Sequence, residues 1–296
     1  MMQTVEEYPV IAADLDGTLI DEHGNPFHDV SKGIRYYTDR NGQVPIVTGK
    51  DPETMFAKTK RRLSELLGRE LTIAHCGGSL ICGTDGEFRV TPLNEDRLDS
   101  AVNLLIATYP RYVTIVPGIA DLEGFGSFAL GQTICWIDQE RVSEIGVVRR
   151  AFAERAYPNK LMSNFTGMID FIRKVKPVHI YFSGFDEGNM PDDDFMKDLE
   201  VLSTPSGSLE IYGVGSKAKG IEILSQMIDV PVDKMIFIGN GIGKKENDYS
   251  VFMMPGLAHK VINSEVQSSK EDYEQFGDNV IVLHPNELGE WLLQFK

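Results

Sequence analysis

An apolar run from Val10 to Ala13 leads directly into Asp14-Leu-Asp16-Gly17-Thr18. Such a run predicts a short buried strand, and the glycine behind it frees the backbone to turn. The strand therefore delivers two carboxylates, one residue apart, to its carboxyl end. Open α/β sheets bind their ligands at that end of the strands, so this stretch is the first candidate for a functional site.

The next elements along the chain favour a parallel sheet. A helix is expected at about residues 30–40, and Val44 to Val47 form a second apolar strand that ends in Thr48-Gly49-Lys50. Asp51 and Pro52 follow as N-cap and first helical residue, which predicts a helix reaching to Gly68. The order strand, helix, strand, helix places the ends of both strands at one edge of a parallel sheet.

The middle of the chain has a different pattern, which predicts an inserted domain. After a third strand at Leu71 to Ala74 and a hairpin-like stretch at residues 80–86, helices alternate with the short runs typical of antiparallel strands. We expect helices at residues 95–108, 144–156 and 192–202 and strands at 112–116, 126–130 and 178–182. The α/β order resumes with a strand at 209–212, a helix at 217–228, strands at 235–238 and 280–283, and a helix at 285–295. This pattern predicts a core of residues 1–84 and 214–296, interrupted by an α+β domain of residues 85–213.

The amino-acid composition limits the classes of binding partner and the cellular compartment to be expected. The net charge of -15 over 296 residues comes with no cluster of Lys and Arg, whereas nucleic acids and anionic membranes require a basic surface. Neither is therefore expected as a partner. Three cysteines are too few for a disulfide framework, residues 1–8 are polar and acidic, and no run of about eighteen apolar residues occurs. These features predict a cytoplasmic protein with neither a secretory signal nor a membrane span.

Four motifs, in order, closely resemble those of the haloacid dehalogenase superfamily, most of whose members are magnesium-dependent phosphatases. They are Asp14-x-Asp16-Gly17-Thr18 after the first strand, Thr48 after the second, Ser216-Lys217-Ala-Lys219-Gly220 at a helix start, and an acidic loop from Gly239 to Asp248. The insertion between the second and third motifs is similar to that of the Cof-like branch. The resemblance covers nearly the whole chain and implies a doubly wound, parallel, Rossmann-like α/β core with an inserted α+β cap.

The chemistry of phosphoryl transfer and the resemblance together imply a role for each motif. Asp14 would be the nucleophile that forms an aspartyl-phosphate, and Asp16 would protonate the leaving alcohol and then activate the hydrolytic water. Thr48 would donate to a phosphoryl oxygen, and Lys217 would neutralise the nucleophile and the phosphate. Lys219 is a rival to Lys217, but the spacing to Gly220 favours Lys217. The residues predicted to bind phosphate are Gly17, Thr18, Thr48, Gly49 and Lys217, and the predicted ligands of Mg²⁺ are Asp14, Asp16, Asn240 and Asp248.

The acidic loop departs from the pattern of the Cof-like branch. That branch has Gly-Asp-Gly-x-Asn-Asp, whereas this chain has Gly239-Asn240-Gly-Ile-Gly-Lys-Lys-Glu246-Asn247-Asp248, with a neutral first residue and four extra residues. The longer spacing is similar to that of the phosphomannomutase branch, which keeps an aspartate first. Asn240 removes one anionic ligand from Mg²⁺. Either Asp248 or Glu246 replaces it in an active enzyme, or the metal is held weakly and activity is low; we adopt the first as our hypothesis. A smaller departure is Cys76-Gly77, where many relatives have Asn-Gly.

These motifs predict a hydrolase that releases phosphate from a small phosphorylated metabolite, a sugar or polyol phosphate, with Mg²⁺ as cofactor. Two alternatives stay open: a phosphosugar mutase, indicated only by the spacing of the acidic loop, and a catalytically weak protein that binds a phosphorylated ligand, indicated by Asn240. A calcium-binding loop is excluded, because an EF-hand has its glycine at the sixth position and follows a helix.

Overall fold

The computed structural model divides into two units by residue contacts. The first unit comprises residues 1–50, 54–89 and 216–296, and the second comprises residues 51–53 and 90–215. The sequence prediction drew the boundaries after residues 84 and 213 and did not separate residues 51–53 from the core. The structure describes residues 3–52, 71–84, 86–119, 121–122, 126–127, 132–138, 161–162, 164–185, 188, 195–196, 199–203, 207–244, 246–263 and 273–296.

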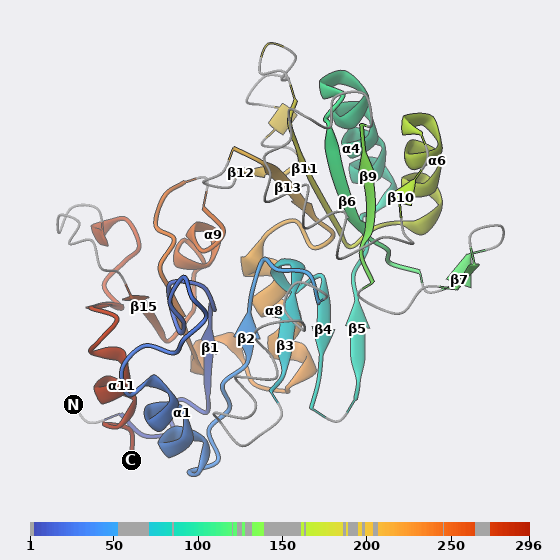
Figure 1. The fold of residues 1–296 in the computed structure, drawn as a ribbon. Helices are drawn as coiled ribbons and strands as arrows, with labels where there is room; N and C mark the ends of the chain where they lie inside the picture. The colour runs from blue at the N-terminus through green and yellow to red at the C-terminus, as the bar shows by residue number, and fades with distance from the viewer. Residues whose placement is uncertain are drawn as a thin grey trace. The chain divides into compact units, whose positions relative to one another are not determined.

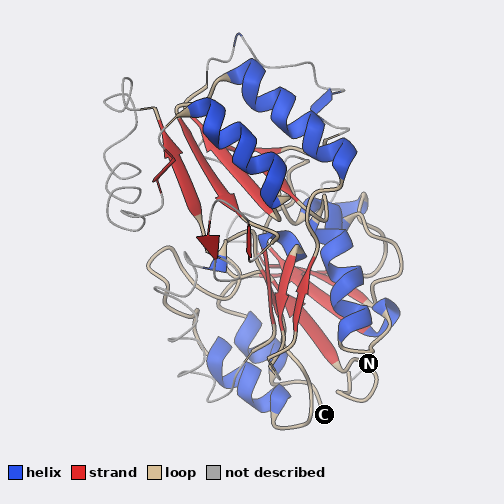
Figure 2. Ribbon diagram, turned by 90° about the vertical axis from the view of Figure 1, so that its right-hand side faces the viewer, coloured by secondary structure: helices blue, strands red, loops and turns tan. Residues whose placement is uncertain are grey.

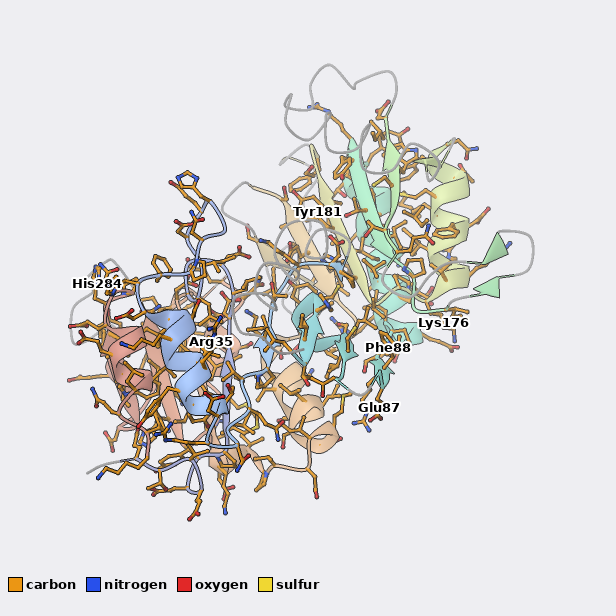
Figure 3. All side chains as sticks on the ribbon, turned by 60° about the horizontal axis from the view of Figure 1, so that its bottom comes forward. Arg35, Glu87, Phe88, Lys176, Tyr181 and His284 are labelled. Carbon is orange, nitrogen blue, oxygen red and sulfur yellow. The ribbon has the colours of Figure 1, made fainter. Side chains whose placement is uncertain are left out.

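The first unit is built on an eight-stranded sheet, of which six described strands run parallel. Their order across the sheet is β16, β15, β14, β1, β2, β3, and the antiparallel β4 and then β5 extend one edge (Figure 1). Phe88 lies on this edge strand β5 (Figure 3), and its side chain is 51% exposed. The bounds are β1 Val10–Ala13, β2 Ile46–Val47, β3 Ile73–His75, β4 Leu80–Cys82, β5 Phe88–Val90, β14 Met235–Gly239, β15 His259–Asn263 and β16 Val280–Leu283.

Both faces of this sheet are buried, because successive side chains of a strand point to opposite sides. Ile11 and Ala13 of β1 pack in one apolar cluster with residues of α1 and α11, and these two helices lie side by side (Figure 1). Val10 and Ala12 pack in a second cluster with residues of α8 and α9. The helix bounds are α1 Val30–Thr38, α8 Lys217–Met227, α9 Tyr249–Phe252 and α11 Leu288–Leu292. The predicted doubly wound α/β core is therefore confirmed.

The second unit has a mainly antiparallel sheet covered by helices on one face (Figure 2). The described strands follow the order β10, β9, β6, β11, β13, β12. Two helices, α4 Glu95–Thr108 and α6 Phe165–Val175, begin after Asn94 and Asn164, whose side chains cap them by accepting from the amides of Arg97 and Gly167. The strands are β6 Tyr112–Val116, β7 Asp121–Leu122, β8 Gly126–Ser127, β9 Ile134–Ile137, β10 Leu161–Met162, β11 His179–Ser183, β12 Leu202–Ser203 and β13 Leu209–Tyr212.

Some elements differ from the sequence prediction. The prediction missed α6 and the strands β5, β7, β9, β10, β12 and β15, and α11 is shorter than the predicted helix at residues 285–295. β15 was missed because it begins with His259 and Lys260; the ammonium group of Lys260 is nevertheless accommodated, because it donates to the carbonyl of Phe276 at 2.8 Å. The predicted helices beyond Pro52 and at residues 144–156 lie outside the described residues, as do five residues of the helix predicted at 192–202. The last residue of that predicted helix, Leu202, belongs to strand β12 instead. None of the helices in the described ranges combines the length and apolarity needed to cross a membrane.

The start of α8 lies directly against the loop that follows β3. Ser216 caps the helix by accepting from the amide of Lys219. The 3-10 turn Cys76–Gly78 comes so close that a Cβ on Gly220 would lie 2.1 Å from the carbonyl oxygen of Gly77. The glycine three residues after Lys217 therefore determines how closely this helix approaches the sheet, and with it the position of the lysine.

Gly220→Ala should lower the free energy of unfolding by about 1–3 kcal/mol, the range for overpacked sites, although alanine is the better helix former by about 1 kcal/mol. The added methyl group meets backbone atoms, which cannot rotate away. Urea unfolding measures the change, and Lys219→Ala on the same helix should stay within about 0.5 kcal/mol of the wild type. A Gly220→Ala protein more stable than the wild type would contradict the close approach.

Candidate functional site

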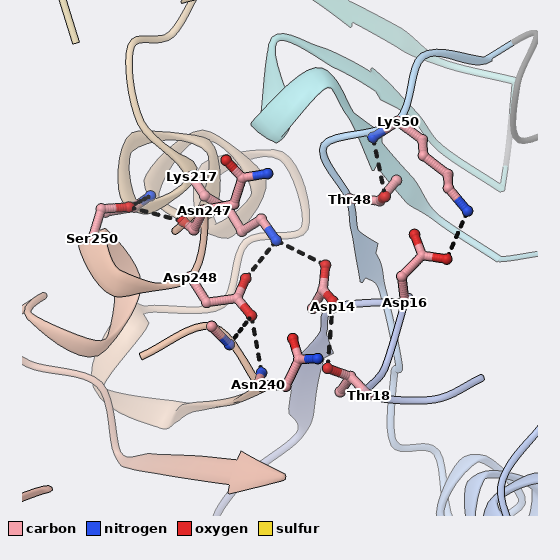
Figure 4. Close-up of polar contacts among 12 residues, drawn as sticks. Asp14, Asp16, Thr18, Thr48, Lys50, Lys217, Asn240, Asn247, Asp248 and Ser250 are labelled. Carbon is pink, nitrogen blue, oxygen red and sulfur yellow. Dashed lines mark hydrogen bonds and ion pairs between the residues drawn. The ribbon is translucent and has the colours of Figure 1, made fainter. Parts of the chain in front are cut away.

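Side chains from five chain segments meet at one edge of the sheet in the first unit (Figure 4). Asp14 follows β1, Thr48 follows β2 and Asn240 follows β14, while Lys217 opens α8 and Asp248 precedes α9. β1 lies between β2 and β14 and is parallel to both, so these three strands end at the same edge. This is the edge at which open α/β sheets bind ligands.

Lys217 is the centre of the site. Its Nζ donates to Asp14 Oδ1 at 2.8 Å and to Asp248 Oδ1 at 2.5 Å. The lysine is 1% exposed, and both carboxylates are buried. A buried charge requires such partners, because leaving it unpaired costs several kcal/mol. Lys219, the alternative in the sequence, is exposed.

Burial and charge act in opposite directions on the acid–base equilibria of this cluster. Burial raises the pKa of Asp14 to about 7, against the lowering effect of Lys217 and with a further rise from Asp248. Burial alone would lower the pKa of Lys217, but Asp14 and Asp248 outweigh it and raise that pKa. Lys217 therefore stays protonated, and two carboxylates share its single positive charge.

Asp248 uses both of its carboxylate oxygens within the protein. Oδ1 accepts from Lys217, and Oδ2 accepts from the backbone amides of Asn240 at 3.0 Å and Gly241 at 3.1 Å. In the same loop, Glu246 Oε2 accepts from the amide of Gly243 at 2.9 Å. Both acidic side chains that could replace an aspartate at position 240 therefore hold the loop itself.

Two buried threonines stand next to the carboxylates. Thr18 Oγ1 donates to Asp14 Oδ2 at 3.4 Å, and the carbonyl of Thr18 accepts from Asn263 Nδ2 at 2.7 Å. Thr48 Oγ1 accepts from the amide of Lys50 at 3.2 Å. Asn263 was missed by the sequence prediction because its strand, β15, was missed.

Asp16, the second aspartate of the first motif, lies in a more exposed environment than Asp14. Asp16 is 49% exposed, and its Oδ1 lies 2.6 Å from Nζ of Lys50. The sequence prediction assigned no role to Lys50. The available signal was its position directly after Thr48-Gly49, at the end of the strand next to β1.

The two glycines predicted to bind phosphate lie on the same strand-end loops. Gly17 has a positive φ of 70°, and a Cβ there would lie 2.3 Å from Nδ2 of Asn240. The Asn240 amide group thus lies over the loop that carries both aspartates. Gly49 is half-buried between Thr48 and Lys50.

The oxygen atoms at this edge fit Mg²⁺ with a coordination shell poor in carboxylates. Within the described residues Asp14 Oδ2 accepts one hydrogen bond, the long one from Thr18, and the side chain of Asn240 lies over the neighbouring Gly17. No group of three or more His, Cys, Asp or Glu side chains in the described part of the chain is arranged to hold a metal ion. Mg²⁺ in proteins often has only one or two carboxylate ligands and keeps several waters. Asp14, Asp16 and Asn240, completed by water, fit that requirement.

Comparisons with known proteins define the fold. No family model matches the chain, and no curated protein matches its sequence. Among solved structures, a haloacid dehalogenase-like hydrolase from B. subtilis is 16% identical, with a TM-score of 0.62 over 97% of this chain and 98% of the other. A haloacid dehalogenase-like hydrolase from Bacteroides thetaiotaomicron is 16% identical, with a TM-score of 0.61 over 96% and 97%. A phosphatase of the same superfamily and organism is 12% identical, with a TM-score of 0.61 over 98% and 93%. The chain therefore has the fold of the haloacid dehalogenase-like hydrolases, which confirms the resemblance at the level of the fold.

Replacing either of the two aspartates that flank Lys217 by asparagine should change the free energy of unfolding, but in opposite directions. Asp14→Asn removes the excess negative charge and leaves the Lys217–Asp248 pair, so at about pH 8 it should raise the free energy of unfolding by about 1–3 kcal/mol. Asp248→Asn removes a hydrogen-bond acceptor either from Lys217 or from the two loop amides. It should therefore lower the free energy of unfolding by about 3 kcal/mol. Urea unfolding in the presence of a chelator compares the two variants.

The gain in the free energy of unfolding from Asp14→Asn should depend on pH. Because the pKa of Asp14 in the folded protein, about 7, lies above its ordinary value of 3.8, the protonated carboxyl group favours the folded state. The wild type therefore keeps this stability below about pH 4 and loses it as the pH rises through about 7. A difference between variant and wild type that does not change between about pH 4 and 8 would contradict the raised pKa.

Proposed function

We propose that this protein hydrolyses a small phosphate monoester, a sugar or polyol phosphate, through an aspartyl-phosphate on Asp14. The observation that carries the proposal is the buried ammonium group of Lys217 against Asp14 Oδ1 at the carboxyl edge of a parallel sheet. One oxygen of Asp14 is held by the lysine, and Oδ2 is the oxygen that would attack phosphorus. The description of similar folds as hydrolases and as a phosphatase supports this reaction class.

The neighbouring groups support the two steps of such a reaction. In the first step the bond from Asp14 to phosphorus forms while the bond to the leaving oxygen breaks, and Asp16 gives that oxygen its proton. In the second step Asp16 takes a proton from the water that hydrolyses the acyl phosphate. Asp16 is half exposed, so its carboxyl group is accessible to solvent. Lys217 and the hydroxyl group of Thr48 would stabilise the charge on the phosphoryl oxygens.

Asp14, Asp16 and Asn240 would hold Mg²⁺ in this proposal, and Asp248 would place Lys217 and the loop beside it. Bound Mg²⁺ supplies positive charge to the phosphoryl oxygens. Asn240 contributes an oxygen without a negative charge, so we expect the ion to dissociate readily.

The proposed partner is a small phosphorylated metabolite, with neither nucleic acid nor membrane. The net charge of -15 supports both exclusions, because either partner requires a basic surface. We place the protein in the cytoplasm, since its three cysteines are too few for a disulfide framework and all are buried.

The protein should release phosphate from at least one sugar or polyol phosphate in a screen with and without Mg²⁺. Asp14→Asn should lower that rate by about a thousandfold or more, because no other group replaces the nucleophile. Circular dichroism and urea unfolding check that the variant is folded. Phosphatase activity retained by Asp14→Asn would refute the assignment of the nucleophile.

A second candidate function is the binding of a phosphorylated ligand with little catalysis. Asn240 favours it, together with the use of both Asp248 oxygens inside the protein, because the metal then has few anionic ligands. A screen without phosphate release above a chelator-insensitive background would select this candidate. The mutase alternative rests on loop spacing alone, and an isomerised sugar phosphate in place of free phosphate would identify it.

Asn240→Asp should raise the affinity for Mg²⁺ by about tenfold, because a carboxylate replaces a neutral ligand. Calorimetric titration with Mg²⁺ alone measures this without relying on activity. Asn247→Asp adds the same charge to the same loop and should have a smaller effect. Equal gains in both variants would mean that Asn240 is no ligand, and a large gain in rate for Asn240→Asp would favour the second candidate function.

A further inference from the structure

Asp16 has one side-chain partner in the part of the chain that the structure describes, and that partner is Lys50. Nζ of Lys50 lies 2.6 Å from Asp16 Oδ1, and the residues follow the adjacent parallel strands β1 and β2 (Figure 4). The pair is distinct from the cluster in which Lys217 joins Asp14 and Asp248. Each aspartate of the first motif therefore has its own lysine.

The backbone of Lys50 is anchored although its side chain is partly exposed. Its amide donates to Thr48 Oγ1 at 3.2 Å, and its carbonyl accepts from the amide of Cys76 at 3.1 Å. The carbonyl of Thr48 in turn accepts from the amide of Gly77 at 2.9 Å. The lysine side chain thus starts from a fixed point, which limits the region that its ammonium group can reach.

The side chain of Asp16, by contrast, has little else to fix its orientation. It is 49% exposed, and the residue that follows it is a glycine. A carboxylate with so few neighbours distributes among its staggered χ1 positions. The contact with Lys50 selects one of these positions and occupies Oδ1 but not Oδ2.

The Lys50–Asp16 pair contributes little to the stability of the fold. Its side chains are 33% and 49% exposed, and exposed ion pairs typically contribute about 0–1 kcal/mol. Removing the pair should therefore leave the free energy of unfolding almost unchanged. An effect on turnover can then be separated from an effect on folding.

We propose that Lys50 is a positioning residue that holds the carboxyl group of Asp16 in place to protonate the leaving oxygen. This rests on the proposed function. As the bond from phosphorus to the leaving oxygen breaks, the proton on Asp16 passes to that oxygen, and Lys50 keeps all of its protons. Placement of this acid matters most for a poor leaving group, because an alkoxide needs the proton and a nitrophenolate does not.

Lys50→Gln tests this role, because it keeps most of the side-chain length and removes the charge. With an alkyl phosphate, kcat should fall about tenfold, and with p-nitrophenyl phosphate it should fall less than about threefold. KM should stay within about twofold for both substrates. Lys50→Arg should recover most of kcat, and Lys219→Gln, the same change at an exposed lysine of the first unit, should leave kcat and KM unchanged.

Asp16→Asn provides a second test, because a positioning residue acts only through the group that it positions. In an Asp16→Asn background, Lys50→Gln should cause no further loss of the remaining p-nitrophenyl phosphate hydrolysis. An additional loss in the double variant would mean that Lys50 acts independently of Asp16.

Two further results would overturn the positioning role. One is an equal loss on both substrates, with a raised KM and weaker calorimetric binding of inorganic phosphate, which would make Lys50 a phosphate contact. The other is an unchanged kcat for the alkyl phosphate in Lys50→Gln. A wild-type protein that releases phosphate neither from these two substrates nor from any sugar or polyol phosphate would refute the proposed function itself, and that failure is recognised before any variant is measured.

Discussion

The placement of one buried ammonium group, that of Lys217, is the condition on which the rest of the site depends. Asp14 and Asp248 are both buried, and two neighbouring carboxylates without a cation would repel each other in a medium that screens charge poorly. The lysine reaches them because Gly220 lets the start of α8 lie against the turn after β3. Asp248 extends the same arrangement to the loop after β14 through two backbone amides. Helix packing, loop closure and charge pairing are therefore parts of one structure.

Asp14 and Asp16 show how two residues of one type acquire different properties from their surroundings. Asp14 is buried and has a raised pKa, whereas Asp16 is half exposed and paired with Lys50. Such a contrast suits a nucleophile held in place beside an acid that meets the leaving group. The site contains three aspartates and two lysines, which leaves one excess negative charge. Because Asn240 is neutral, it adds no further negative charge.

The fold class was predictable from the sequence because the order of apolar runs and turn residues determines which strand ends share an edge. That order placed Asp14 and Thr48 together, and the helix start at Ser216 added Lys217; their roles stay predictions. The contacts of Asp248 were not predictable, because they depend on where the amides of a long loop point. Lys50 was not recognised because nothing in its spacing distinguishes it from a surface lysine. β15, and with it Asn263, was hidden by two polar residues at its start, one of which buries its ammonium group against a backbone carbonyl.

The division of the first unit along the chain has a consequence for synthesis. β1 is flanked by β2, which is made soon after it, and by β14, which ends at Gly239. An emerging chain therefore carries one side of its central strand unpaired until the whole second unit has been translated. Apolar strands with open edges are prone to associate with other chains. The order of synthesis thus leaves one edge of β1 open to association with other chains during translation.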